Sequence, residues 1–407
     1  MNNFTSVKIS EIGRVVTGKT PPTRDKTNYG SEYMFIGPTD LHQHFVINNS
    51  QKTISEKGIS CIKGSILNQL SILVGCIGWD MGNVALVKEK CATNQQINSI
   101  TDVKDQYNPY YIYYWLTGKK EFLFQQANVT RTPILNKTDF SKIEIPIPEK
   151  QQQDKISSVL TALDDKIALN NKINAELEGM AKLLYDYWFI QYDFPISAEQ
   201  AKSMGDPALT GKPYKSNGGP LTHNKTLKRD IPEDWEDSTV ETIIGTAPRS
   251  SKIARTKYNE EGKIPIVDQS SNFICGFTDD EDSLIKAIHP FIIFGDHTRI
   301  VKLIDFDFAR GADGTQILFS NHQSVPQYLF HQILKSIDLS SYGYARHFKF
   351  LKLQKITIPS ESVAQNYEKK VKPFYSTIEN NRKQNHHLTT LRDWLLPMLM
   401  NGQVTVK

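Results

Sequence analysis

Two loops of the sequence place basic side chains where they could contact the phosphates of a nucleic acid. Residues 12–24 hold three basic residues and no acidic one, and residues 245–259 hold four basic residues and no acidic one. Lysine and arginine in loops that also contain serine, threonine or tyrosine suit hydrogen bonds to phosphate oxygens and to base edges. Any single residue is equally well explained as solvated loop charge, but the recurrence of the set favours contact with DNA.

The basic residues recur at matching positions in the two halves of the chain. At a spacing of 231 residues, Arg24 corresponds to Arg255 and Lys26 to Lys257. A third pair follows before the end of each half, where Arg131 corresponds to Arg346. The candidate DNA-contacting residues are Lys19, Arg24, Lys26, Arg131, Arg249, Lys252, Arg255, Lys257, Arg299 and Arg346.

One stretch, Gly13–Thr20, fits the phosphate-binding-loop pattern G-x-x-x-x-G-K-[ST]. That chemistry needs a helix that begins at the lysine, because the first amides of the helix hold the phosphates. Pro21 and Pro22 follow at once, and a residue before proline is driven out of helical geometry. We therefore expect a turn that displays Lys19, and no nucleotide site.

No other pattern predicts a metal site or a catalytic residue. His42 and His44 could share one face of a strand, but no cysteine or carboxylate cluster completes a metal site, so we expect solvated histidines. Asn108–Tyr111 lacks the second proline of a methyltransferase N-P-P-Y/F loop, and neither a G-x-G nor a hydrolase G-x-S-x-G is present. Asp164–Lys166 lies in a helical stretch, where we expect a solvated charged face. The chain is interpreted as a binding and scaffold protein.

Composition bounds the class of protein. The 407 residues suggest roughly two to three domains, and 39% hydrophobic residues are enough for folded cores. A net charge of +4 is only mildly basic, so a nucleic-acid surface must come from where the charges lie. The four scattered cysteines form no C-x-x-C pair, and no apolar run approaches the length of a membrane span. We expect a cytoplasmic protein without membrane contact.

The sequence contains a divergent internal repeat at about half its length. The offset between matching segments falls from 231 to 211 along the chain, as small insertions and deletions in loops would produce. The matching segments are Met34–Ile36 with Pro265–Val267, Asn94–Ile97 with Gly314–Ile317, Pro109–Tyr111 with Pro326–Tyr328, and Ile145–Pro148 with Ile356–Pro359.

The repeat divides the chain into five parts. Each copy starts with short β-rich runs broken by turn residues, which predict a compact mixed α/β domain, and continues into a long helical stretch. We expect strands at 71–76, 83–87, 290–294 and 300–304 and helices at 110–116 and 327–334. The parts are a first globular domain (1–148), a first long helix (149–190), a glycine- and proline-rich surface linker (191–231), a second globular domain (232–359) and a second long helix (360–402).

Both long helices have an apolar seam at coiled-coil spacing, interrupted at matching places by two asparagines. If the helices pair antiparallel, Asn170 and Asn174 face Asn385 and Asn381, and the two halves are related by a pseudo-twofold axis. A buried seam asparagine fixes the register, because it is unsatisfied opposite an apolar partner. The alternative is that each helix packs only on its own domain and the match is chance.

A seam of this length predicts a spacer of roughly 50 Å between two globular domains. Two divergent copies of one DNA-reading domain would then read two different short sequences, separated by bases that they ignore. A symmetric dimer implies a palindromic target, whereas a divergent duplication within one chain implies an asymmetric one.

This organisation and several short stretches resemble the specificity subunit of type I restriction-modification enzymes. The order is globular domain, long helix, globular domain, long helix, and the resemblance spans nearly the whole chain. The second copy departs from it where Asp268 replaces Gly37 and where Gly314-Thr315 replaces Asn94-Gln95. The stretches that resemble the family are Thr17–Pro21, Phe35–Asp40, Ala92–Ile97, Ile145–Pro148 before Gln151–Gln153, Leu184–Phe189, Gly211–Lys215 and Ile231–Trp235.

The resemblance implies a mixed α/β, pseudo-twofold protein whose two target recognition domains are held apart by two long antiparallel coiled-coil helices. It implies a non-catalytic subunit of a complex that binds double-stranded DNA. Two modification subunits would dock on the helices, bind S-adenosylmethionine and methylate adenine, and restriction subunits would translocate and cleave DNA with ATP and Mg²⁺. This chain itself would bind no cofactor.

A second interpretation stays open on the residues alone. The globular domains could grip protein partners and read no DNA, which would make the chain an interaction scaffold. The sequence does not give the half-sites, because base readout depends on loop geometry and on DNA shape.

Overall fold

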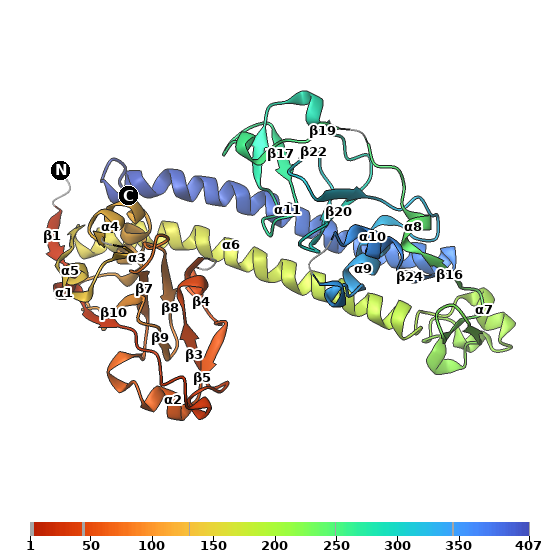
Figure 1. The fold of residues 1–407 in the computed structure, drawn as a ribbon, viewed down its shortest axis with the longest axis horizontal. Coiled ribbons are helices and arrows are strands. Elements are labelled where there is room, and N and C mark those ends of the chain that lie inside the picture. The colour runs from red at the N-terminus through yellow and green to blue at the C-terminus, as the bar shows by residue number, and fades with distance from the viewer. Residues whose placement is uncertain (1–3, 43–44, 130, 249, 344–345, 407) are drawn as a thin grey trace. The chain divides into compact units, whose positions relative to one another are not determined.

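The computed structural model describes residues 4–406 except 43–44, 130, 249 and 344–345. By its internal contacts the chain divides into two compact units (Figure 1). Unit 1 comprises Met1–Asn170 with Lys383–Lys407, and unit 2 comprises Asn171–Arg382. Each unit therefore contains one globular α/β domain and a segment of each long helix.

The two long helices are α6 and α11. α6 spans Lys150–Tyr185 and is extended by a π-helical turn, Asp186–Ile190, and α11 spans Glu361–Met400. Within each unit, residues later in α6 contact residues earlier in α11, so the helices pair antiparallel. The contacting pairs are Asp164–Arg392 and Asn170–Asn385 in unit 1 and Asn174–Asn381 and Ala181–Tyr367 in unit 2.

The globular domain of unit 1 is built on two sheets. One has five strands in the order β2-β10-β7-β8-β4, and the other has four in the order β5-β3-β9-β6. β7, β8 and β10 are buried along their whole length, as short β-rich runs predict for central strands. The strands are β2 (Arg14–Thr17), β3 (Tyr33–Ile36), β4 (Val46–Ile47), β5 (Lys52–Ile54), β6 (Ile66–Leu67), β7 (Ser71–Gly75), β8 (Val84–Val87), β9 (Cys91–Thr93) and β10 (Ile97–Thr101).

Short helices and strand pairs complete this domain. α3 (Pro109–Thr117) packs on β7 and β8 and begins where Asn108 accepts hydrogen bonds from two amides, with proline at the first helical position. β1 (Thr5–Lys8) pairs antiparallel with β13 (Glu144–Ile147), just before α6. The remaining elements are α1 (Ile9–Ile12), α2 (Glu56–Ser60), α4 (Lys120–Gln125), β11 (Asn128–Val129), β12 (Pro133–Ile134) and α5 (Lys137–Lys142).

The globular domain of unit 2 has the same plan with fewer strands. Its sheets have the orders β18-β17-β22-β19 and β21-β20-β23, and β16 (Glu236–Thr239) pairs antiparallel with β24 (Lys355–Ile358). Its other elements are α8 (Val240–Ile243), β17 (Ile264–Val267), β18 (Gly276–Thr278), β19 (Leu284–Ile285), β20 (Phe291–Gly295), β21 (Val301–Ile304), β22 (Phe308–Arg310), β23 (Thr315–Leu318), α9 (Gln327–Ser336) and α10 (Phe348–Lys352).

The strand pairing confirms the internal repeat. β3 pairs in parallel with β9, and β17 pairs in parallel with β22, while the strands on either side of each pair run antiparallel. The predicted helices at 110–116 and 327–334 are α3 and α9, and the four predicted strands are β7, β8, β20 and β21. The mixed α/β class is therefore also confirmed.

The sequence match between Asn94–Ile97 and Gly314–Ile317 is wrong in its register. Asn94 N–H donates to Ile36 O at 3.0 Å, and the equivalent bond in unit 2 runs from Gly311 N–H to Val267 O at 2.9 Å. The partner of Asn94 is therefore Gly311. In the strand that follows, Ile97 pairs with Gly75 and Thr315 pairs with Gly295, so the strand is shifted by two residues and the loop before β23 is one residue longer. A shift of two keeps the same face of a strand pointing inward, so the apolar pattern did not reveal it.

The segment 191–231 is not a bare surface linker, contrary to its glycine and proline content. It contains α7 (Ala198–Ser203) and the hairpin of β14 (Leu221–Asn224) and β15 (Arg229–Pro232). Phe194 is fully buried between the rings of Tyr214 and Trp235, with ring centroids at 4.6 and 5.3 Å. These stacked aromatic rings give a short segment enough apolar contact to fold, and the glycines serve its turns.

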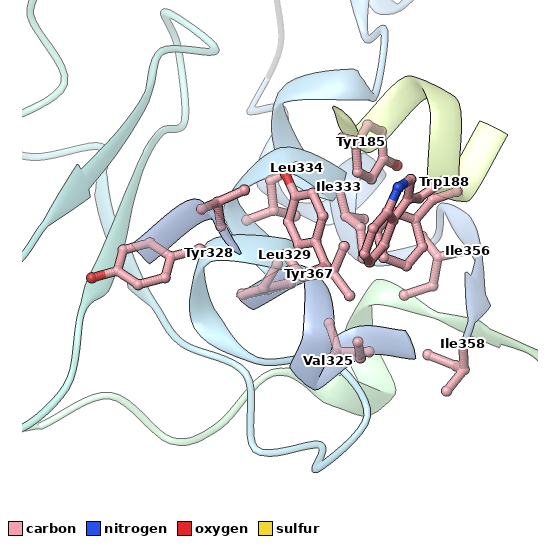
Figure 2. Packing of buried hydrophobic residues seen from close by; sticks show 14 of the residues in the cluster. Tyr185, Trp188, Val325, Tyr328, Leu329, Ile333, Leu334, Ile356, Ile358 and Tyr367 are labelled. Atoms are coloured by element: carbon pink, nitrogen blue, oxygen red, sulfur yellow. The ribbon is translucent and has the colours of Figure 1, made fainter. Parts of the chain in front are cut away.

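Trp235 belongs to the main core of unit 2, which gathers side chains from four parts of the chain. Figure 2 shows Tyr367 of α11 among the apolar side chains of α9, with Tyr185 and Trp188 from the end of α6. The rings of Trp188 and Tyr367 meet edge to face at 6.0 Å. The long helices are thus part of the core of the globular domain and also pair with each other.

Candidate nucleic-acid interface

In unit 1 several loops meet at one end of the five-stranded sheet. β2 and β7 finish at this end and β8 and β10 begin there, as the pairing of Thr17 with Asn98 and of Gly75 with Ile97 requires. We call it the loop end of unit 1. The loop end of unit 2 is the equivalent edge, where β20 finishes and β21 and β23 begin.

Lys19 is displayed at the loop end of unit 1. Gly18 approaches Asn94 so closely that a Cβ atom would lie 2.0 Å from the Asn94 carbonyl oxygen, so only glycine fits there. Lys19 N–H then donates to Thr93 O at 2.9 Å, and the lysine side chain is exposed. Residues 18–22 are not helical, in agreement with the rejection of a phosphate-binding loop.

Arg131 reaches the same end from a different part of the chain. It is exposed and precedes β12, whose Pro133 O accepts from Gly78 N–H at 3.0 Å. Leu135 N–H also donates to Cys76 O at 2.9 Å. The loop that follows β7 and the segment 131–135 are therefore joined, and we call them loop pair 1.

The loop after β7 is held rigidly by Asp80. The Asp80 carboxylate contacts Lys120 Nζ at 2.6 Å and His42 Nε2 at 3.1 Å, and Asn83 Nδ2 also donates to it. The Lys120 contact is the main reason that the pKa of Asp80 is lowered. His42 holds this loop through its contact with Asp80. Among the described residues no group of three metal-ligating side chains occurs, and His44 lies outside the described residues.

Arg24 and Lys26 lie on the loop between β2 and β3, and both are exposed. Their match to Arg255 and Lys257 is shifted in the structure. The 3₁₀ turn Lys26–Asn28 in unit 1 corresponds to the turn Arg255–Lys257 in unit 2, since each is closed by the amide of the tyrosine that follows it. Lys26 therefore matches Arg255, because the loop before the turn has a different length in the two copies.

In unit 2, Lys252 is displayed much as Lys19 is in unit 1. The neighbouring Ile253 N–H donates to Arg310 O at 3.0 Å, which repeats the Lys19–Thr93 bond. Lys252 Nζ pairs with Asp313 Oδ1 at 2.8 Å and, as the main cause, lowers the pKa of that exposed carboxyl, with Arg310 and Arg346 adding to the effect. Three basic side chains thus lower the pKa of Asp313 at this loop end, and Lys252 forms an ion pair with it.

Arg299 and Arg346 also lie at the loop end of unit 2, and both are exposed. Asp296 O accepts from His347 N–H at 2.8 Å, as Cys76 O accepts from Leu135 N–H in unit 1. The proposed match of Arg131 with Arg346 is therefore wrong by three residues. Lys257 is exposed on its turn, and Arg249 lies outside the described residues.

The seam asparagines meet within the two units. In unit 1, Asn170 Nδ2 donates to Asn385 Oδ1 at 2.8 Å and to Gln384 Oε1 at 2.7 Å. In unit 2, Asn381 Nδ2 donates to Asn174 Oδ1 at 2.8 Å. These are the partners that antiparallel pairing predicts. The alternative, in which each helix packs only on its own domain, is wrong because the two helices are hydrogen-bonded to each other.

The expectation of a solvated charged face at Asp164–Lys166 is wrong for Asp164. Its side chain is 3% exposed, accepts from Tyr114 OH at 2.7 Å and pairs with Arg392 Nη1 at 2.6 Å. Burial alone would lower the pKa of Arg392, but the adjacent Asp164 raises it overall. The aspartate ties α3 to both long helices, and its apolar heptad neighbours are the signal that could have revealed its burial.

The sequence of the first half matches a known family. Residues 1–179 match the type I restriction modification DNA specificity domain. The chain is also similar to the type I restriction enzyme MjaIX specificity subunit of Methanocaldococcus jannaschii, with 27% identity over 98% of this chain and 93% of that protein. The HindI specificity subunit of Haemophilus influenzae is 26% identical over 65% of this chain and 70% of that protein.

The chain is thus similar to type I specificity subunits. A crystal structure of the type I restriction-modification system S subunit from M. genitalium has the same fold, with a TM-score of 0.56, 17% sequence identity and coverage of 98% of this chain and 96% of that one. The domain that matches residues 1–179 is a DNA specificity domain and not a catalytic one. Among the chain's described helices none is both long and apolar enough to cross a membrane.

The chain also exposes apolar side chains on both long helices, which the heptad analysis missed. Met180, Leu183 and Tyr187 are exposed on α6 and its π-helical extension, and Leu391 and Trp394 are exposed on α11. Leu391 and Trp394 lie 211 positions after Met180 and Leu183, so each copy has an equivalent set. We call these sets the apolar stripes. They could have been found from the sequence by looking for apolar residues outside the a and d positions of the heptads.

Proposed function

We propose that this chain reads an asymmetric, bipartite DNA target, with one half-site for each recognition domain. In this proposal the two loop ends contact the bases and phosphates of the two half-sites. The observation that carries it is that one strand topology presents a loop end in each unit, while the side chains at the two ends differ. A shared scaffold with different loops fits two different sequences read in a similar way.

The charge at the two loop ends supports contact with DNA. In unit 1, Lys19 and Arg131 are exposed there, and in unit 2 Lys252 and Arg346 are exposed and, with Arg310, lower the pKa of Asp313. Arginine suits bidentate contact with guanine, and lysine suits phosphate oxygens. Such contacts position a domain on the duplex and also select its sequence.

The apolar stripes suit two copies of one partner. Exposed clusters of large apolar side chains mark interaction sites, and the two stripes occupy equivalent places on the two copies of the repeat. We assign them to two modification subunits, one for each stripe, with restriction subunits joining the same complex in the cytoplasm. S-adenosylmethionine, ATP and Mg²⁺ would then be bound by those subunits and not by this chain.

The test is single-molecule methylation sequencing of DNA from cells that express this chain with its cognate modification subunit. We expect methylated adenine in an asymmetric motif with an unspecified gap, and we expect the motif to disappear when this chain is deleted. A complex that assembles without methylating any motif would overturn the proposal.

The scaffold interpretation is separated from DNA reading by a gel shift at low salt. The assembled complex should retard random DNA weakly and its motif DNA strongly. Assembly without any DNA retention would favour a scaffold that grips only proteins.

A further inference from the structure

The loop ends of the two units differ most at one pair of loops. Loop pair 1 consists of the loop after β7 and the segment 131–135. Its equivalent in unit 2, loop pair 2, consists of the loop after β20 and the segment 346–347. In both pairs the residue just after the strand accepts the amide hydrogen bond that joins the two segments, from Leu135 to Cys76 and from His347 to Asp296.

This shared bond gives the two loop pairs a common starting point, although the loop after β7 is three residues longer than the loop after β20. Trp79 lies three residues after Cys76, and Arg299 lies three residues after Asp296. Ile134 directly precedes Leu135, and Arg346 directly precedes His347. All four side chains are exposed. Unit 1 thus presents an aromatic and an aliphatic side chain where unit 2 presents two guanidinium groups.

Trp79 is an unusual surface residue because its indole is 70% exposed on a firmly held loop. Gly78 and Gly82 adopt φ values of +103° and +93°, which side chains other than glycine rarely adopt. Asp80 is fixed by Lys120 and Asn83. The loop backbone is therefore held before anything binds, so binding through Trp79 costs little further backbone entropy.

The indole also has apolar neighbours at the loop end. The rings of Trp79 and Phe124 lie 6.0 Å apart, and Ile77 forms a β-bridge with Ile134, which is 41% exposed. Lys19 and Arg131 are exposed at the same end of the sheet. An apolar contact surface is therefore flanked by cations, an arrangement suited to base edges between phosphates.

Loop pair 2 identifies the occupant, because two exposed arginines suit DNA. Arg299 Nη1 donates to Leu339 O at 3.3 Å, and Arg346 lies close enough to Asp313 to lower the pKa of that carboxyl. The hydrogen bond of Arg299 uses one of the five N–H donors of its guanidinium, so its fork has further donors for a ligand. If loop pair 2 faces DNA, the equivalent loop pair 1 faces DNA too.

We propose that Trp79 and Ile134 read the first half-site through apolar contact with thymine C5-methyl groups, at the place where Arg299 and Arg346 read the second half-site through guanine. This assignment rests on the proposed DNA-reading function. It follows from the chemistry of the major groove, where the thymine methyl is the apolar feature and the guanine O6 and N7 atoms are the acceptors that arginine engages.

The test uses the full chain in complex with its modification subunit and duplex DNA of the motif found by methylation sequencing. Each thymine of each half-site is replaced in turn by deoxyuridine, which lacks only the C5-methyl group. We expect one replacement in the first half-site to weaken binding by the wild-type complex about ten-fold. Trp79→Ala should weaken binding to the unmodified motif by a similar factor and should no longer respond to that replacement.

The controls separate a local effect from a general one. Ile288→Ala removes another exposed large apolar side chain, which lies just before the start of β20 and so away from the loop end, and should keep the full response to deoxyuridine. Trp79→Phe keeps an aromatic side chain and should retain most of the affinity. In the Trp79→Ala complex, discrimination at the second half-site should be unchanged, which shows that the variant is folded and assembled.

Several outcomes would overturn the assignment. They are a Trp79→Ala complex that binds the motif normally, a wild-type complex that is insensitive to every deoxyuridine in the first half-site, and an equal loss of discrimination at both half-sites. Loss of modification-subunit binding in Trp79→Ala would assign the indole to a protein partner instead. These results differ from failure of the proposed function, in which the wild-type complex itself methylates no motif.

Discussion

Asp164 of α6 and Arg392 of α11 form an ion pair of 2.6 Å that is largely removed from solvent. Counting 211 positions along the repeat, the residue that corresponds to Asp164 is Tyr375, and the residue that corresponds to Arg392 is Ala181. Tyr375 OH accepts from Gln332 Nε2 at 2.7 Å and contacts His331 Nδ1 at 3.1 Å. Burial lowers the pKa of His331 to about 3, so this second network is neutral. At these equivalent positions one half of the repeat has an ion pair and the other has neutral hydrogen bonds, while the ion pair of the helices in unit 2 lies elsewhere, between Glu178 and Arg382 at 3.1 Å.

The ion pair gives a stability prediction. Arg392→Met leaves the Asp164 carboxylate buried without its cation, so we expect the free energy of unfolding to fall by about 3 kcal/mol. Denaturant unfolding followed by circular dichroism measures this loss. Lys172→Met is the control, because Lys172 and Glu176 form an exposed ion pair on α6 at 4.0 Å. For this variant we expect the free energy of unfolding to fall by less than about 1 kcal/mol. Equal losses in both variants would contradict the role given to Asp164.

The exposed arginines of the loops should control the salt dependence of DNA binding. Arg24→Ala or Arg255→Ala removes one phosphate contact, so the slope of log K against log salt should decrease by about one unit, on specific and random DNA alike. Titration of labelled duplex at several salt concentrations gives the slope. Arg14→Ala is the matched control, because Arg14 is exposed but pairs with Asp102 at the opposite end of the sheet, at 2.6 Å. An unchanged slope in both loop variants would remove these two residues from the interface.

The apolar stripes should control how many modification subunits bind. Leu183→Asp places a charge on one stripe and Trp394→Asp places one on the other, and each should weaken one docking event by at least about ten-fold. Mass photometry of the mixed subunits should then show a one-to-one complex for either single variant and no complex for the double variant. Lys172→Asp changes an exposed residue outside the stripes and should leave the two-to-one complex intact. Two bound subunits in the double variant would place docking elsewhere.

A buried glutamate predicts how stability depends on pH. Burial is the main cause that raises the pKa of Glu368 to about 7, although its carboxylate accepts hydrogen bonds from Tyr328 N–H and Leu329 N–H. In the unfolded chain this glutamate loses its proton near the ordinary pKa of 4.5, whereas in the folded chain its pKa is about 7. The free energy of unfolding therefore falls as the pH rises between those values. Above pH 7 the loss is complete and constant.

Glu368→Gln should remove this component. The difference in the free energy of unfolding between Glu368→Gln and the wild type should grow in favour of the variant from about pH 4.5 to about pH 7 and then level off. Thermal or urea unfolding across this range measures it. Glu361→Gln, at the exposed first turn of the same helix, should show no such trend. A difference that does not vary with pH would contradict the raised pKa.

Features of the fold that depend on periodicity could be predicted from the sequence. The seams of α6 and α11, the asparagine partners and the helices α3 and α9 all follow from spacing that the chain itself contains. Features that depend on loop length could not. Lys26 corresponds to Arg255 and Asn94 to Gly311 because the loops of the two copies differ in length. The positions of these insertions are visible only from the backbone hydrogen bonds.

Two other features were misjudged because composition is a weak guide to burial. Segment 191–231 has the glycines and prolines of a linker, yet stacked aromatic rings fold it onto the core of unit 2. Asp164 has the charge of a surface residue, yet a tyrosine and an arginine from distant parts of the chain satisfy it in the interior. Neither partner is visible from local sequence.

The pairing of β1 with β13, repeated by β16 with β24, has an evolutionary consequence. In each globular domain the first strand lies against the strand that leads into a long helix, so the chain enters and leaves the domain at neighbouring points. A block with adjoining ends can be replaced without altering the path of the rest of the chain. Recombination between related genes at these two strands would exchange a whole recognition domain in one event, and a cell would acquire a new target sequence while its helices and partner subunits stayed the same.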